Sequence, residues 1–354
     1  MDQALAASTL RDQDSAAADL RDWLTSLGEG VDLGNVGPEF LLVYLEEEWL
    51  PSHPGRKRGR AGPKAVAGVL SSLSGWFERF GRAGPYQPAT GVGNPCNCQW
   101  VSDYRKGYRR GGMLEGYEEV SAVPLTPEKY KRLCVYLFQR YLGEPGVVAG
   151  LVLLRDLLCS QYMWQSTMRG HDTGKLGLAD FCDPDRPGAV DTRLPLPPPW
   201  SWPAGRQYRL CVRERGTKTS RTRRADPVFL EPNPGRPELC FPRTLALYMW
   251  RSAQPGAPGC AVRSWLFRPL TSDRRGFKEE PLSSSALGAR IRRHLRDADL
   301  YAGETSHSFR RGALQAAAAE GVGTAGLMGL GQIRSPAILA RYLDPHRHGA
   351  RQVV

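Results

Sequence analysis

Residues 305–312 read Thr-Ser-His-Ser-Phe-Arg-Arg-Gly and open a stretch that continues with an alanine-rich run, Gly-Val-Gly at 321–323, Gly-Gln-Ile-Arg-Ser-Pro at 331–336 and Ala-Arg-Tyr-Leu at 340–343. His307 and Arg310 are three residues apart, so on a helix they share one face and could bind one anion together. Tyr342 adds a hydroxyl further along. Taken alone, the pair could be solvated or structural, and Tyr342, among apolar neighbours, could be a core residue.

The combination is more specific than its parts. A His-x-x-Arg that opens an alanine-rich helix, followed by a glycine turn, a short helix, a glycine-led turn and Arg-Tyr, resembles the C-terminal signature of the tyrosine recombinases, the phage-integrase family. The resemblance implies that Tyr342 is the nucleophile and that His307 and Arg310 hold the scissile phosphate. Within the family, His-Ser-Phe-Arg-Arg-Gly-Ala is most similar to recombinases of eukaryotic mobile elements of the crypton and DIRS type.

Two other stretches resemble the remaining motifs of the family. Ser-Thr-Met-Arg169-Gly-His-Asp172 follows a long apolar segment, as the family's first arginine and its acid do. A charge is costly to bury unpaired, so a simple Arg169–Asp172 ion pair is the alternative. Gly-Thr-Lys218-Thr-Ser matches the lysine that the family carries on a hairpin turn, although a hairpin lysine is normally just solvated.

The resemblance implies a reaction that needs neither metal nor other cofactor. Tyr342 would attack a phosphodiester while Arg169 and Arg310 stabilise the charge on its nonbridging oxygens. His307 would assist proton removal from the tyrosine, and Lys218 would protonate the departing 5′-oxygen. The product would be a 3′-phosphotyrosine and a free 5′-hydroxyl, which a second 5′-hydroxyl can reverse without ATP.

One position departs from the family pattern. Nine residues before Tyr342, where members commonly have His or Trp, stands Ile333, which can pack but cannot donate a hydrogen bond. Gln332 could supply an amide there if the turn shifts by one residue. The departure leaves open a recombinase-derived DNA-binding protein that no longer cuts. A type IB topoisomerase, which shares the chemistry, is a third possibility.

Length and charge limit the possible partners. The 354 residues suffice for two domains, each with its own core. Lys and Arg outnumber Asp and Glu by 48 to 36, and the net charge of +12 favours a polyanion. Only eight of the 48 are lysines. Arginine suits bidentate phosphate contacts, although a GC-rich genome gives the same bias. The expected partner is double-stranded DNA, bound by a homo-oligomer between dimer and tetramer.

Several features indicate an intracellular protein. No stretch approaches the roughly 18 apolar residues of a membrane span, and the N-terminus lacks the basic start and apolar run of a signal peptide. The eight cysteines include no Cys-x-x-Cys, which predicts reduced structural thiols and no metal site. We expect the nucleus if the chain belongs to a eukaryotic mobile element and the cytoplasm otherwise.

Periodicity predicts a mainly α chain with a small β-sheet. Residues 1–118 are expected to form a helical core-binding domain, with helices over 8–27, from Pro38, over 64–80 and over 101–110. This layout is similar to the core-binding domain of the tyrosine recombinases. The basic residues of its loop and last helix are expected to contact DNA, with a solvated helix face as the alternative: Arg56, Lys57, Arg58, Arg105, Lys106, Arg109 and Arg110.

Residues 119–354 are expected to form an α+β catalytic domain. After a linker at 111–123, Thr126 as cap and Pro127 at the first position predict a helix, and a long apolar helix follows over 147–168. Strands are expected within 176–181, 208–214 and 227–230. Lys218 and Arg221, another expected DNA contact, lie between the last two. The proline-rich segment 184–203 is expected to be an irregular insertion. Helices at 242–251 and 284–297 lead into the signature.

Overall fold

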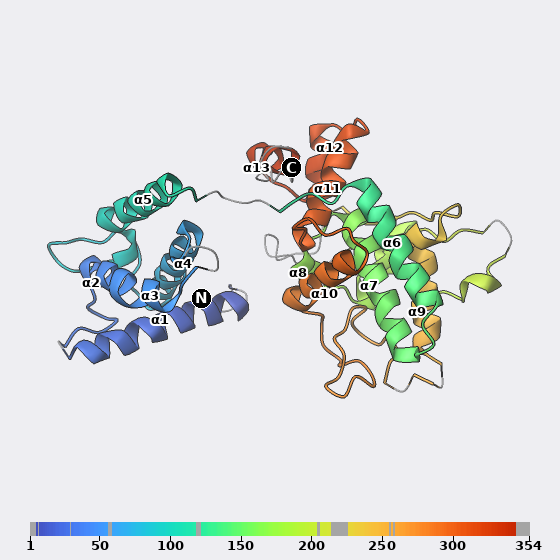
Figure 1. Cartoon of the computed structure of the whole chain (residues 1–354), viewed down its shortest axis with the longest axis horizontal. Helices are drawn as coiled ribbons and strands as arrows, with labels where there is room; N and C mark the ends of the chain where they lie inside the picture. The colour runs from blue at the N-terminus through green and yellow to red at the C-terminus, as the bar shows by residue number, and fades with distance from the viewer. Residues whose placement is uncertain are drawn as a thin grey trace. The chain divides into compact units, whose positions relative to one another are not determined.

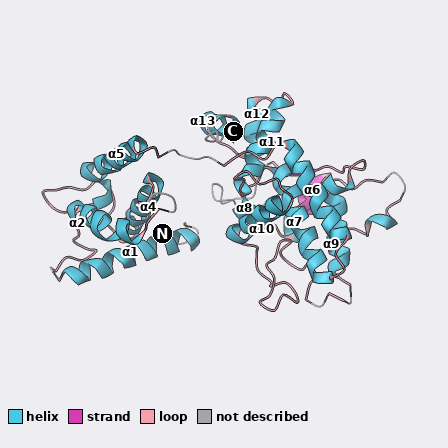
Figure 2. Ribbon diagram, in the orientation of Figure 1, coloured by secondary structure: helices cyan, strands magenta, loops and turns pink. Residues whose placement is uncertain are grey.

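Buried apolar residues gather in separate clusters before and after residue 119. The computed structural model describes residues 5, 7–28, 30–55, 59–117, 122–203, 206–213, 226–254, 256–257 and 259–344. It divides into two units, Met1–Glu119 and Val120–Val354, each with its own core. The described chain is mainly helical with one small sheet, as the sequence predicted (Figures 1 and 2).

The first unit is a set of helices around one core. Its elements are α1 (Ala7–Leu27), α2 (Pro38–Val43), the π-helical η2 (Tyr44–Trp49), α3 (Leu50–Ser52), α4 (Pro63–Arg79), the 3-10 turn η3 (Pro95–Asn97) and α5 (Gln99–Leu114). The expected helices are confirmed, and the one that begins at Pro38 contains a π-helical stretch. On α4, the apolar stripe from Val66 to Phe77 is buried in the core.

The linker prediction was wrong at its start, because α5 continues through Gly111 and Gly112 to Leu114. Gly112 allows a close approach of the helix to the start of α4. A Cβ on Gly112 would lie 3.1 Å from Pro63 Cγ. Tertiary packing thus overrides the low helix propensity of glycine.

The second unit is built around one buried helix, α7 (Val147–Ser166), against which α6 (Pro127–Leu142) packs. The hydroxyl of Thr126 accepts the Lys129 N–H at 3.3 Å, which confirms the predicted cap. By length and composition α7 could cross a membrane, contrary to our expectation that no segment is apolar enough. In the structure, 78% of its most apolar window is buried inside the unit, where it serves as the core helix.

A four-stranded antiparallel sheet has the order β2-β1-β3-β4. Its strands are β1 (Phe181–Asp183), β2 (Arg186–Val190), β3 (Leu210–Val212) and β4 (Val228–Leu230). Two predictions were wrong here. Before Phe181 the chain forms a 3-10 turn, η4 (Leu178–Asp180), because the Asp180 carboxylate accepts the Gly177 N–H at 2.8 Å. The proline-rich segment contains β2, an edge strand, where proline is tolerated.

The remaining elements lead to the C-terminal signature. They are α8 (Gly170–Thr173), η5 (Pro199–Ser201), η6 (Pro237–Leu239), α9 (Phe241–Ser252), α10 (Ser284–Asp297), α11 (Ser306–Ala319), α12 (Thr324–Gly331) and α13 (Pro336–Leu343). Gly312 on α11 lies against the chain before α6, where an added Cβ would be 1.8 Å from Leu125 O. α12 and α13 pack on α11 (Figure 1). All eight cysteines are buried free thiols, as predicted.

Candidate active site

Arg310 is a charged side chain buried where three helices meet. It is 1% exposed. Its Nη1 donates to Thr167 O at 2.9 Å and its Nη2 donates to Gly331 O. These carbonyls end α7 and α12, so one side chain of α11 joins both helices. The Arg310 Cζ lies 5.0 Å from the centre of the Tyr342 ring on α13.

The surroundings of Arg310 leave it without an ion pair to any described carboxylate. Its Nη1 and Nη2 donate to neutral carbonyls, its side chain also hydrogen-bonds that of Tyr342, and its Nε has no hydrogen-bond partner. Burial lowers the pKa of Arg310, Tyr342 and Asp172 act against this effect, and the neighbouring positive charge of Arg169 lowers the pKa further. Two guanidiniums held near each other in this way attract an anion that can bridge them.

Arg169 is positioned by the sharp end of α7. Thr167 adopts a left-handed conformation (φ 54°) and its hydroxyl donates to Leu330 O at 2.8 Å. The chain therefore turns, and half-buried Arg169 begins the short helix α8. The next residue is Gly170, and a side chain would not fit there, because an added Cβ would lie 2.8 Å from Ser306 Cβ on α11. The residues on either side of Arg169 are thus fixed against α11 and α12.

The alternative of a simple Arg169–Asp172 ion pair is not realised. In the described chain no salt bridge joins these side chains, and only the backbone connects them, through the Asp172 N–H and Arg169 O at 2.9 Å. The Asp172 Oδ2 is buried without a hydrogen-bond partner. Asp172 instead contributes a negative charge near Arg310.

The start of α11 explains the Thr-Ser-His-Ser sequence. The Thr305 hydroxyl accepts the His307 N–H at 3.2 Å, and the Ser308 hydroxyl accepts the Thr305 N–H at 2.8 Å. This capping box fixes the first turn. The His307 side chain is exposed, whereas Arg310 is buried. The two side chains are therefore in different environments, although a three-residue spacing puts them on one face of α11.

Tyr342 is half-buried on a small apolar cluster formed by Leu314, Leu327, Ile333 and Leu339. The Ile333 side chain is 6% exposed and packs as the sequence analysis expected. Gln332 ends α12 in a left-handed conformation (φ 47°) and is outside this cluster. The turn therefore places Ile333, which has no donor, in the packing that supports Tyr342.

Five of the predicted residues lie outside the described part of the chain. They are Lys218 and Arg221, between β3 and β4, and the loop residues Arg56, Lys57 and Arg58. The other predicted DNA contacts, Arg105, Lys106, Arg109 and Arg110 on α5, are all exposed.

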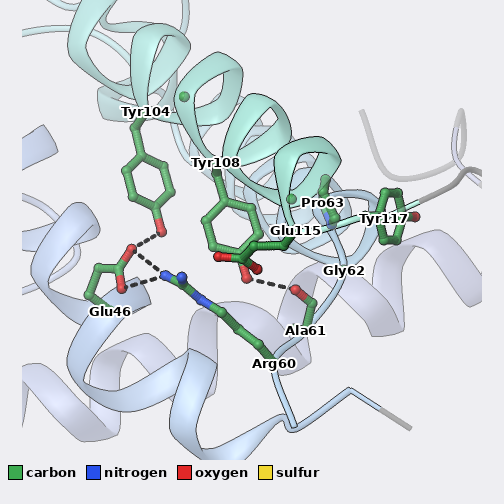
Figure 3. Close-up of a pocket in the computed structure, with 12 residues that line it drawn as sticks. Glu46, Arg60, Ala61, Gly62, Pro63, Tyr104, Tyr108, Glu115 and Tyr117 are labelled. Atoms are coloured by element: carbon green, nitrogen blue, oxygen red, sulfur yellow. Dashed lines mark hydrogen bonds and ion pairs between the residues drawn. The ribbon is translucent and has the colours of Figure 1, made fainter. Parts of the chain in front are cut away.

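The tyrosines between these cations have a packing role. Tyr104 OH donates to Glu46 Oε1 at 2.6 Å, and Tyr108 OH donates to Ala61 O at 2.6 Å. Figure 3 shows both rings leaning from α5 toward these partners, beside Arg60. Tyr104 and Tyr108 thus hold α5 on its unit.

The sequence analysis missed a buried ion cluster between α7 and α10. Asp156, in the middle of α7, accepts hydrogen bonds from Arg155 (Nη2, 2.8 Å), from His294 (Nε2, 2.8 Å) and from Arg290. An Arg-Asp pair inside an apolar helix was the signal that could have indicated it. The carbonyl partners of Arg310 gave no such signal, because any residue has a carbonyl.

The chain is similar in structure to recombinases and integrases. The XerH site-specific recombinase bound to palindromic difH substrate, in a post-cleavage complex, has a TM-score of 0.49 at 14% identity, covering 88% of this chain and 69% of that chain. A Tn1549 transposon integrase in complex with circular intermediate DNA has a TM-score of 0.45 at 14% identity, covering 89% and 81%. A lambda integrase dimer bound to a COC′ core site has a TM-score of 0.41 at 12% identity, covering 93% and 77%. No family model matches the sequence, and no curated protein matches it significantly.

Proposed function

We propose that this protein is a site-specific DNA recombinase or integrase that cuts and rejoins DNA through a 3′-phosphotyrosine on Tyr342. The observation that carries the proposal is the buried guanidinium of Arg310, which forms no ion pair with any described carboxylate and whose Cζ lies 5.0 Å from the centre of the Tyr342 ring. A tyrosine hydroxyl beside a fixed, buried cation suits attack on an anionic ester.

The two arginines would act as the phosphate clamp. Attack by Tyr342 on a phosphodiester builds negative charge on the nonbridging oxygens, and donors fixed in advance stabilise that charge most effectively. Arg310 is fixed by Thr167 O and Gly331 O, and Arg169 lies close enough to lower its pKa. The repulsion between the two cations is relieved when a phosphate binds between them.

The reaction needs one proton removed and one supplied. The Tyr342 hydroxyl oxygen forms a bond to phosphorus, and the bond from phosphorus to the 5′-oxygen breaks. We assign proton removal from the tyrosine to His307, which begins α11, and protonation of the 5′-oxygen to Lys218. Rejoining runs the same steps backward with another 5′-hydroxyl, so the bond energy is conserved and no ATP is needed.

DNA binding would draw on both units of the chain. The exposed cations of α5 suit contacts to a phosphate backbone, which fix orientation without reading sequence. Assembly as a dimer to tetramer on DNA is part of the proposal.

A second candidate is a recombinase-derived protein that binds DNA without cutting it. The observation that favours it is that Ile333 is buried in the apolar cluster against which Tyr342 packs. A histidine or tryptophan at this position would offer a hydrogen-bond donor to the phosphate, and isoleucine does not. A type IB topoisomerase would use the same clamp, and it would relax supercoiled DNA without exchanging strands.

One experiment separates these candidates. A binding site is first selected from random duplexes, and a nicked version of that site is then incubated with the protein and run on a denaturing gel. Covalent protein–DNA adduct from the wild type but not from Tyr342→Phe supports cleavage through Tyr342, and strand exchange between two copies of the selected site then distinguishes the recombinase from the topoisomerase. Selected binding without any adduct supports the second candidate, and no binding to duplex DNA rejects both.

A further inference from the structure

A second cluster of positive charge lies in the catalytic unit, away from Tyr342. A cleft of about 320 Å³ is lined by four arginines, Arg140 on α6, Arg290 and Arg293 on α10 and Arg274 in the loop before α10. Two carboxylates, Glu144 and Asp297, also line it. The cations therefore exceed the anions by two.

Most of these arginines are not committed to a strong partner. Arg140 Nη1 donates to the neutral Tyr136 OH at 3.0 Å. Arg293 is 3.7 Å from Asp297, with 76% of its side chain exposed, so this surface pair is weak. Of the four, only Arg290 contacts a buried carboxylate, that of Asp156, and it does so through Nε. No hydrogen bond to a described residue uses its two Nη nitrogens, which can therefore donate to a ligand.

His294 supplies a second, independent observation. It lines the cleft, is 7% exposed, and bonds Asp156 through Nε2 at 2.8 Å, while its Nδ1 is buried without any partner. A carboxylate only accepts, so Nε2 is the donor in that bond. A proton on Nδ1 would make that atom a second donor, able to bond an anion in the cleft. A buried polar atom without a partner is rare in a folded protein.

The cleft is distinct from the clamp at Tyr342. Its apolar wall is the first half of α7, including Val148 and Val152, whereas Arg169 lies three residues beyond Ser166, the last residue of that helix. A helix of 20 residues is about 30 Å long. One phosphate therefore cannot occupy both places.

We propose that this cleft binds a phosphate group, held by Arg140, Arg290, Arg293 and the Nδ1–H of His294. Planar guanidiniums suit the bidentate contacts that phosphate oxygens accept, and the apolar wall of α7 excludes water from one side. The phosphate has two possible sources, a free phosphorylated compound or the DNA backbone. The inference concerns a site separate from the reaction at Tyr342 and stands without it.

The test is calorimetric titration of the full chain with pyrophosphate at constant ionic strength. We expect one saturable event whose affinity falls about tenfold or more in Arg293→Gln and in Arg140→Gln, since each loses a charge-assisted hydrogen bond. His294→Gln places its amide near the former Nε2, so it keeps a donor for Asp156 and loses Nδ1, and it should weaken binding without unfolding the chain. Arg296→Gln, on the same helix but outside the cleft, is the matched control and should bind like the wild type.

Two further arms identify the source and the place of the phosphate. In the first arm, a short DNA duplex is titrated with the wild type and with Arg293→Gln. Weaker duplex binding by the variant, with a slope of log affinity against log salt concentration reduced by about one counterion, indicates the DNA backbone. Unchanged duplex binding indicates a free compound. In the second arm, Arg310→Gln is titrated with pyrophosphate, and binding in the cleft should be unchanged in this variant. The proposal is overturned if pyrophosphate binding depends on Arg310 and not on Arg293, if Arg296→Gln loses as much affinity as Arg293→Gln, or if the wild type shows no saturable binding.

Discussion

Replacement of Arg310 by alanine perturbs the structure and the reaction by different amounts. The change leaves the buried carbonyls of Thr167 and Gly331 without their donor. Each buried, unsatisfied acceptor costs about 1 to 3 kcal/mol, so the free energy of unfolding should fall by about 2 to 4 kcal/mol, with water filling part of the space. Urea denaturation measures this loss.

The cleavage rate should fall further. Loss of one fixed donor to a developing oxyanion commonly lowers the rate about a hundredfold to a thousandfold. Single-turnover cleavage of the nicked site, at saturating DNA and below the unfolding transition, isolates this effect. Arg334→Ala is the matched control, because it removes an exposed arginine from the turn between α12 and α13 and should cleave at the wild-type rate.

A folded Arg310→Ala variant that cleaves within about tenfold of the wild-type rate would refute the role of Arg310 in the clamp. The clamp would then have to lie elsewhere. Equal losses in Arg310→Ala and Arg334→Ala would instead show that positive charge in general, and not this donor, supports cleavage.

Three other predictions address the nucleophile, the departure from the family pattern and the packing of α11. Tyr342→Phe should bind DNA like the wild type and form no adduct on a denaturing gel; adduct from this variant would move the nucleophile to another residue. Ile333→His should raise single-turnover cleavage by up to about a hundredfold by supplying a donor, and a crippling effect of Gln332→Ala would show that the amide already does so. Gly312→Ala should lower the free energy of unfolding in urea by about 3 kcal/mol or more, because its Cβ would lie 1.8 Å from Leu125 O and the backbone has to move. Wild-type stability of that variant would mean that the close approach is not required.

The helices could be predicted from the sequence where side chains mark their ends. Thr126 with Pro127 marks the start of α6, and Ser283 caps α10 through its hydroxyl at 3.2 Å from the Ala286 N–H. The strands were harder, because β1 to β4 have only three to five residues and local bonds compete with them. The bond from Asp180 to Gly177 turned an expected strand into a 3-10 turn.

The candidate site could be predicted in its residue types but not in its contacts. The resemblance to the tyrosine recombinases implied that Arg310 and Tyr342 belong to one site, and the Arg310 Cζ lies 5.0 Å from the centre of the Tyr342 ring. The carbonyls of Thr167 and Gly331 are distant in sequence from Arg310, by 143 and 21 residues, and carry no residue preference. The absence of an Arg169–Asp172 ion pair also could not be predicted, because two side chains three residues apart can pair or not according to the packing around them.

The helix that carries Tyr342 rests on a cluster of four buried apolar residues that is separate from the main core of its unit. So small a cluster provides little local free energy against opening, compared with the core around α7. The amide hydrogens of α13 should therefore exchange with deuterium while those of α7 stay protected. Under the proposed function, Tyr342 leaves its position and returns while the rest of the second unit remains folded, and its approach to a bound phosphate is set by a local equilibrium of α12 and α13.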